Sequence, residues 1–98
     1  MKYSVKQNGN ALEVTVEGRL DTVSAPTLQS ELEPMLHGID ELTFDFSKLD
    51  YISSAGLRTL LSAHKSLNMG GKTRVIHCNP VVKEVFAVTG FDKIMTIE

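Results

Sequence analysis

Two adjacent serines, Ser53 and Ser54, are the hydroxyl groups whose positions best suit chemistry in this sequence. They follow a strand-like segment and open a helical one, in the run DYISSAGL. One of the two is expected to cap the helix, and Ser53 is favoured. Ser54 then lies in the first turn, where free N–H groups and the helix dipole favour a dianionic phosphate. A simple helix cap is the commoner use of such a pair.

Nucleophilic catalysis is a second chemistry open to Ser53 or Ser54, with the helix start as an oxyanion site. A nucleophilic serine needs an adjacent general base that is oriented by a third group. His77 is the nearest candidate because it ends a predicted strand, but the sequence gives it no evident partner. The run also lacks a Gly-x-Ser-x-Gly elbow. We therefore expect that the protein is not an enzyme and that neither serine is a catalytic residue.

The sequence has no metal-ligand spacing. His37, His64 and His77 are isolated from one another, and Cys78 lacks the further ligands that a zinc site needs. His64 falls on the apolar face of its predicted helix, which favours a partly buried histidine with a hydrogen-bond partner. We expect neither a metal nor a cofactor.

Three aspartates and one arginine are the other polar candidates. Asp21 comes at the end of the predicted second strand, where it is also typical of a turn or capping residue. Asp45 alternates with two phenylalanines and is expected to face solvent, whereas Asp50 is expected to cap or orient the loop before the helix. Arg58 should be exposed one turn into the helix that Ser54 begins.

Strands and helices that alternate along the chain must position these residues. Alternating runs on either side of Asn8-Gly9-Asn10 predict a hairpin over 3–18, and 41–49, 73–78 and 93–98 predict further strands. The order is β-β-α-β-α-β-α-β. It predicts an α/β fold with a mixed, mostly parallel sheet, an antiparallel N-terminal hairpin strand and three main helices.

The first helix is expected to have Ser24 as its N-cap, Pro26 in its first turn and a kink or early end at Pro34. Its apolar stripe is Leu28, Leu32, Met35 and Leu36. The second helix should end at Gly70-Gly71 and has the stripe Leu57, Leu60, Leu61, His64 and Leu67. Asn79-Pro80 should begin a third helix that ends at Gly90; its stripe is Val82, Val85, Phe86 and Thr89.

Composition limits the classes of function. The 98 residues, expected to form one domain over 1–98, carry ten basic and twelve acidic side chains, a net charge of −2, which disfavours nucleic-acid binding. No apolar run approaches the roughly 20 residues of a spanning helix, and the N-terminus lacks the apolar core of a signal peptide. The lone Cys78 forms no internal disulfide, so a cytoplasmic location is expected.

Three stretches resemble the STAS domain family, the family of bacterial anti-sigma factor antagonists. FDFSKLDYISSAGLRTLL is similar to the family's central motif. VEGRLDTVSAPTL resembles its second strand and first-helix entry, and NPVVKEVFAVTGFDKIMTI resembles its C-terminal end. The resemblance covers nearly the whole chain in order, and it implies a single STAS-type domain.

The resemblance also implies site residues. The family's phosphoacceptor serine lies two residues before the motif glycine, which makes Ser54, two before Gly56, the acceptor. The family usually has Asp before that serine, and Ser53 stands there, so Ser53 is the alternative acceptor. The partner-binding residues would be Asp21, Ser53, Ser54, Ala55, Gly56 and Arg58.

The implied partners are an anti-sigma factor of the histidine-kinase-like ATPase type, which phosphorylates the acceptor serine, and a serine phosphatase that resets it. The unphosphorylated form would bind the anti-sigma factor and release the sigma factor. STAS domains also serve in stress-signalling assemblies, lipid-transport complexes and transporter tails. The first two stay open as alternatives, and a free-standing chain of 98 residues disfavours a transporter tail.

Overall fold

The computed structural model describes residues 1–98, and its elements follow the predicted order. The strands are β1 (Lys2–Asn8), β2 (Ala11–Leu20), β3 (Glu41–Ile52), β4 (Lys72–Ile76) and β5 (Thr96–Ile97). The helices are α1 (Ser24–Leu32), α2 (Ser54–Lys65) and α3 (Pro80–Thr89), with two 3₁₀ turns, η1 (Glu33–Met35) and η2 (Phe91–Lys93).

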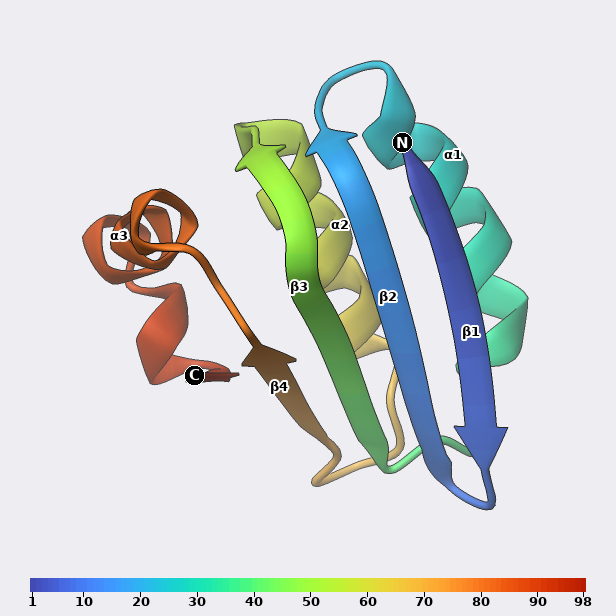
Figure 1. Ribbon diagram of the computed structural model, residues 1–98. Coiled ribbons are helices and arrows are strands. Elements are labelled where there is room, and N and C mark those ends of the chain that lie inside the picture. Colours follow the sequence, from blue (N-terminus) through green and yellow to red (C-terminus); the bar gives the residue numbers. More distant parts are fainter.

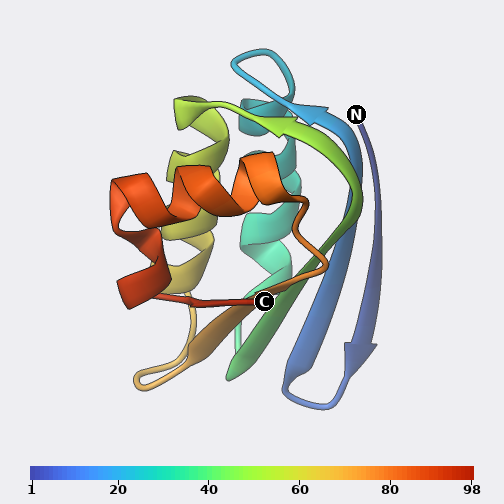
Figure 2. The ribbon, with the colours of Figure 1, turned by 60° about the vertical axis from the view of Figure 1, so that its left-hand side comes forward.

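The five strands form one sheet in the order β1-β2-β3-β4-β5. β1 is antiparallel to β2, and every later pair is parallel, so the predicted α/β fold is confirmed. Gly9, with a φ of +60°, makes the tight turn of the opening hairpin possible. The three helices lie on the same face of the sheet (Figures 1 and 2).

The core lies between the sheet and the helices. The alternating apolar residues of β2 and β3 are buried on the helix side, as their spacing predicts: Leu12, Val14, Val16, Leu42, Phe44 and Phe46. Leu28, Leu32 and Leu36 meet them from the first helical segment. Met35 was expected to join this stripe but is 38% exposed. Pro34 follows the end of α1 at Leu32, and the tighter 3₁₀ turn directs Met35 away.

Two boundaries differ from the sequence-based expectation. β3 continues to Ile52, so Asp50 is an exposed strand residue and does not cap the loop. Pairing with β2 extends the strand, because Tyr51 and Ile52 lie opposite Arg19 and Leu20. α2 ends at Lys65, well before the two glycines.

The chain after α2 is held by local polar bonds. The Ser66 hydroxyl donates to the Ser62 carbonyl at 2.9 Å, and the Asn68 side chain donates to Asp40 at 2.7 Å.

The C-terminal strands are also shorter than expected. β4 buries only Thr73 and Val75, and β5 has two residues because η2 and the turn that follows it take up residues 91–95.

β2 and β3 are the two longest strands, and they end side by side. Their register places Leu20 opposite Ile52. The connection from β2 to α1 therefore lies beside the connection from β3 to α2, at the upper end of the sheet in Figure 1. None of the helices combines the length and the apolar character needed to cross a bilayer.

Candidate functional site

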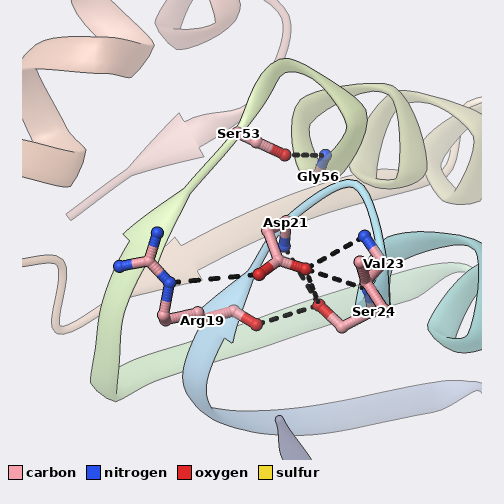
Figure 3. A network of polar contacts seen from close by, with 6 residues as sticks. All are labelled: Arg19, Asp21, Val23, Ser24, Ser53 and Gly56. Carbon is pink, nitrogen blue, oxygen red and sulfur yellow. Dashed lines mark hydrogen bonds and ion pairs between the residues drawn. The ribbon is translucent and has the colours of Figure 1, made fainter.

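Ser53 is held on both sides at the junction of β3 and α2. Its extended backbone (φ −96°, ψ 174°) places its Oγ to accept a hydrogen bond from the Gly56 N–H at 3.3 Å (Figure 3). Its own N–H donates to the Leu20 carbonyl at 2.9 Å, which ties the helix start to β2. The prediction that Ser53 caps the helix is confirmed.

Ser54 is the first residue of α2, and its side chain is exposed. Its hydroxyl makes no hydrogen bond within the chain, whereas the neighbouring Ser53 hydroxyl is half-buried and bonded. Of the two adjacent serines, only Ser54 therefore presents a free hydroxyl to a partner.

Gly56 is buried where α2 passes over the ends of β2 and β3. A Cβ at this position would lie 2.7 Å from Ile52 Cγ1 and 3.0 Å from the Leu20 carbonyl oxygen. The glycine is thus required by contacts inside the domain. Its expected role in partner binding is indirect, because Gly56 sets how closely α2 and Ser54 approach the sheet.

Asp21 organises the loop between β2 and α1. Its Oδ1 accepts hydrogen bonds from the N–H groups of Val23 and Ser24 at 3.1 and 3.0 Å (Figure 3). The expectation that Ser24 is the N-cap is wrong. Ser24 is the first helical residue, and its hydroxyl lies 2.9 Å from the Arg19 carbonyl oxygen and 3.1 Å from Asp21 Oδ1. The aspartate takes the free N–H groups because its carboxylate is the stronger acceptor.

Hydrogen bonds and a nearby arginine stabilise the ionised form of Asp21. The hydrogen bond from the Ser24 backbone lowers the pKa of this carboxyl below its usual value, and Arg19 contributes a further attraction. Arg19 Nε lies 3.9 Å from Asp21 Oδ2. The same guanidinium lies 4.2 Å from the centre of the Tyr51 ring, so Arg19 joins the ends of β2 and β3.

Three residues of this surface were missed by the sequence reasoning: Arg19, Val23 and Tyr51. Val23 is 83% exposed at the tip of the Asp21 loop, and Tyr51 is 40% exposed. The alternation of β3 directs Tyr51 outward, and a strand predicted over 41–49 does not include this residue. We call Arg19, Asp21, Val23, Tyr51 and Ser54 the upper-edge surface.

The remaining predicted site residues lie on α2. Ala55 is half-buried and packs against the core, so little of it can be reached by a partner. Arg58 is exposed, as expected, one turn beyond Ser54. It lines a groove between α1 and α2 together with Gln29, Ser30 and Glu33.

His77 has a partner, which the sequence did not indicate. Its Nδ1 lies 3.2 Å from Asp45 Oδ1. Asp45 is accordingly only 21% exposed in its side chain, which corrects the expectation of a solvent-facing residue. Partial burial acts to raise the pKa of Asp45, but hydrogen bonds from the Ser47 N–H and from His77 lower it overall.

This His77–Asp45 pair is remote from Ser54. Asp45 lies opposite Ile76, the last residue of β4, and Ile52 is seven positions further along β3. At about 3.3 Å per residue, the separation along the strand is roughly 20 Å. The pair therefore supplies no general base to either serine.

His64 and Cys78 are accounted for by contacts inside the domain. His64 Nδ1 lies 2.7 Å from the Thr73 hydroxyl, which confirms the expected hydrogen-bonded histidine. Burial raises the pKa of the Cys78 thiol to about 11, with Lys83 opposing the shift, so the thiol is protonated at neutral pH. The structure contains no cluster of three or more side chains suited to a metal ion.

Comparison with known proteins agrees with this geometry. The family model described as "STAS domain" matches residues 2–98. The chain belongs to the STAS domain family. This STAS domain is 32% identical to BtrV of Bordetella bronchiseptica, which is assigned as an anti-sigma factor antagonist, over 99% of this chain and 85% of that protein.

A second relative is the anti-sigma-B factor antagonist of Bacillus subtilis, with 29% identity over 99% of this STAS domain and 90% of the relative. Among solved structures, the fold matches the anti-sigma factor antagonist SpoIIAA in its unphosphorylated form, with a TM-score of 0.87, 17% identity, and coverage of 99% and 88%. The phosphorylated form of SpoIIAA from Bacillus gives a TM-score of 0.78, 16% identity, and coverage of 99% and 91%.

Proposed function

We propose that this STAS domain is an anti-sigma factor antagonist whose upper-edge surface binds an anti-sigma factor, with Ser54 as the switch. The unphosphorylated domain binds the anti-sigma factor, which is also a serine kinase of the histidine-kinase-like ATPase type, and the sigma factor is released. Phosphorylation of Ser54 ends binding, and a serine phosphatase restores it. The setting is the cytoplasm.

The difference between the two serines is the observation that carries this proposal. The Ser54 hydroxyl is exposed and unbonded, whereas the Ser53 hydroxyl is occupied by the Gly56 N–H. A kinase must reach the acceptor oxygen and position it in line with a phosphate, and only Ser54 permits this without breaking a helix cap. The names of the relatives, and the fact that SpoIIAA is described in both phosphorylation states, support the same function.

The upper-edge surface has the composition of a small docking site. Val23 and Tyr51 offer exposed apolar area, and Arg19 and Asp21 supply opposite charges beside them. Aromatic and arginine side chains are enriched among residues that dominate binding energy. The hydrogen bonds that the Asp21 carboxylate accepts hold the loop in one conformation, which reduces the entropy lost when a partner binds.

Phosphorylation would act on the interface and leave the fold intact. A phosphate adds about −1.5 to −2 charges at neutral pH. At the first residue of α2 this charge is locally favourable, so the helix has no reason to unfold. In an interface, the same charge brings desolvation and repulsion of several kcal/mol, which corresponds to a hundredfold or greater loss of affinity.

The proposal treats the domain as a binding module and not as an enzyme. The separation between Ser54 and the His77–Asp45 pair supports this, since a serine nucleophile requires an adjacent base. A fluorophosphonate probe, which reacts with activated serines, tests it. We expect no labelling, and stoichiometric labelling of Ser54 would contradict the proposal.

The direct test uses the ATPase-type kinase encoded beside this protein, or, where none adjoins it, each kinase of that class from the same genome. Purified domain, kinase and ATP are incubated, the modified residue is located by mass spectrometry, and binding is measured by titration calorimetry. We expect phosphate on Ser54 and loss of binding with it. Ser54→Ala should bind but not be modified, and Ser53→Ala should still be modified. Phosphate found on Ser53 alone, or binding that is unchanged by phosphorylation, would refute the proposal.

A further inference from the structure

Arg58 lies close enough to Ser54 for its side chain to contact a group that is attached to the serine. Both side chains are exposed on α2, four residues apart. Residues with this spacing lie on the same helical face, with about 5–6 Å between their Cβ atoms. This distance is within reach of a guanidinium, which binds phosphate oxygens with paired N–H donors.

The guanidinium of Arg58 also forms no ion pair in the structure. The ion pairs of the chain are Arg19–Asp21, Arg74–Glu98 and His77–Asp45, and none of them involves Arg58. Glu33 of η1 lines the same groove as Arg58, but no ion pair joins the two side chains. The guanidinium is therefore free to bind either a partner or a new anion.

We infer that Arg58 binds the phosphate on Ser54 in the phosphorylated domain, through an ion pair between successive turns of α2. This inference rests on the proposed function, because it concerns the phosphorylated state of the same residue. Phosphorylation then changes two groups that a partner can contact: the hydroxyl of Ser54 in the upper-edge surface is lost, and the guanidinium of the neighbouring Arg58 is withdrawn from the partner.

The charges around the phosphate favour Arg58 over the other cations. Arg19 is already occupied by the Tyr51 ring and by Asp21, and Asp21 itself repels a phosphate at this end of the sheet. Lys65 is on the same helix but eleven residues from Ser54, which is roughly 16 Å along the helix axis. Arg58 is the one cation on α2 within one turn of Ser54.

The experiment installs phosphoserine at position 54 by genetic encoding, so that it needs neither the kinase nor the partner. The second ionisation of the phosphate, near pH 6, is followed by ³¹P NMR in the wild type and in Arg58→Ala, Arg58→Lys and Lys65→Ala. Arg58→Ala and Lys65→Ala each remove one positive charge from an exposed position of α2, so they form a matched pair.

We expect the titration midpoint of the wild type to lie a few tenths of a pH unit below that of Arg58→Ala, because the guanidinium favours the dianion. Lys65→Ala should keep the wild-type midpoint, and Arg58→Lys should fall between. High salt should remove most of the difference. Equal midpoints in the wild type and Arg58→Ala, or equal shifts in Arg58→Ala and Lys65→Ala, would overturn the inference.

The inference and the proposed function fail separately. If phosphorylation leaves partner binding unchanged but the midpoint shift is present, the proposed switch is wrong and the ion pair stands. If binding is lost on phosphorylation and no shift is seen, the switch stands and Arg58 takes no part in holding the phosphate.

Discussion

The Oγ of Ser53 accepts the N–H of Gly56 at 3.3 Å, and this bond separates the roles of two adjacent serines. Ser53 is used to begin α2, and Ser54 is left exposed in the first turn. The neighbouring hydroxyls are thus distinguished by their hydrogen bonding, which can be tested by replacing each of them with alanine.

Ser53→Ala should destabilise the domain, and Ser54→Ala should not. Loss of an N-cap side chain costs about 1 kcal/mol, which lowers the melting temperature of a domain of this size by roughly 4–8 °C. Ser54 contributes no hydrogen bond, and alanine is the better helix former, so its loss should be neutral within about 0.5 kcal/mol. Urea unfolding of both variants measures this. Equal losses of stability in the two variants would show that the Ser53 side chain does not cap α2.

Ser54→Asp should weaken binding of the anti-sigma factor while leaving the fold intact. A negative charge in the first turn of a helix is favourable by roughly 0.3–1 kcal/mol, so the melting temperature should be unchanged or slightly higher. Aspartate carries about half the charge of a phosphate, which predicts a partial loss of affinity. Calorimetric titration, paired with thermal melts, is the measurement. Destabilisation in proportion to the loss of binding would mean that the switch acts by unfolding.

Gly56→Ala should destabilise the domain, although alanine favours helices. The added Cβ would lie 2.7 Å from Ile52 Cγ1 and 3.0 Å from the Leu20 carbonyl oxygen, and such overpacking costs about 1–3 kcal/mol. Helix propensity alone predicts a gain of roughly 1 kcal/mol. The sign of the change in the free energy of unfolding therefore decides whether overpacking or helix propensity is the larger effect.

Chemical denaturation gives that sign, and the pair Arg58→Ala and Arg58→Gly calibrates the propensity at an exposed position of the same helix. A more stable Gly56→Ala variant would show that α2 does not approach the sheet as closely as the structure has it.

Asp21→Asn should destabilise the domain at neutral pH and lose its effect in acid. Hydrogen bonds from Ser24 and Val23 lower the pKa of Asp21, so the unfolded chain takes up the proton before the folded chain does. The stabilisation is therefore present above the ordinary carboxyl pKa, near 4, and is lost as the pH falls through the lowered value.

Urea unfolding of the wild type and Asp21→Asn at pH 7, 5 and 3 checks this, with Asp50→Asn as a control that removes the same charge from an exposed strand position. The gap between wild type and Asp21→Asn should be widest at pH 7 and narrowest at pH 3. A gap that grows in acid would contradict the assigned hydrogen bonds.

The sequence by itself determined the order of the elements, the mixed sheet, the cap at Ser53 and the place of Ser54 in the first turn of α2. These features depend on local signals: apolar spacing, turn residues and the preference of serine for helix starts. Asn79 is a further residue whose role follows from a local signal. Its side chain accepts the Val82 N–H at 2.8 Å, as the Asn-Pro pair predicts.

Only the tertiary structure decided which distant residues meet. The pairing of Leu20 with Ile52 brings the Asp21 loop beside α2, places Arg19 over Tyr51 and makes Gly56 necessary. The contact between His77 and Asp45 likewise depends on the pairing of β3 with β4. A one-residue change of register would turn the side chains of the shifted strand to the opposite face, so Arg19 would no longer lie over Tyr51. Register is fixed by the packing of the whole sheet against its helices, so no local pattern in the sequence specifies these contacts.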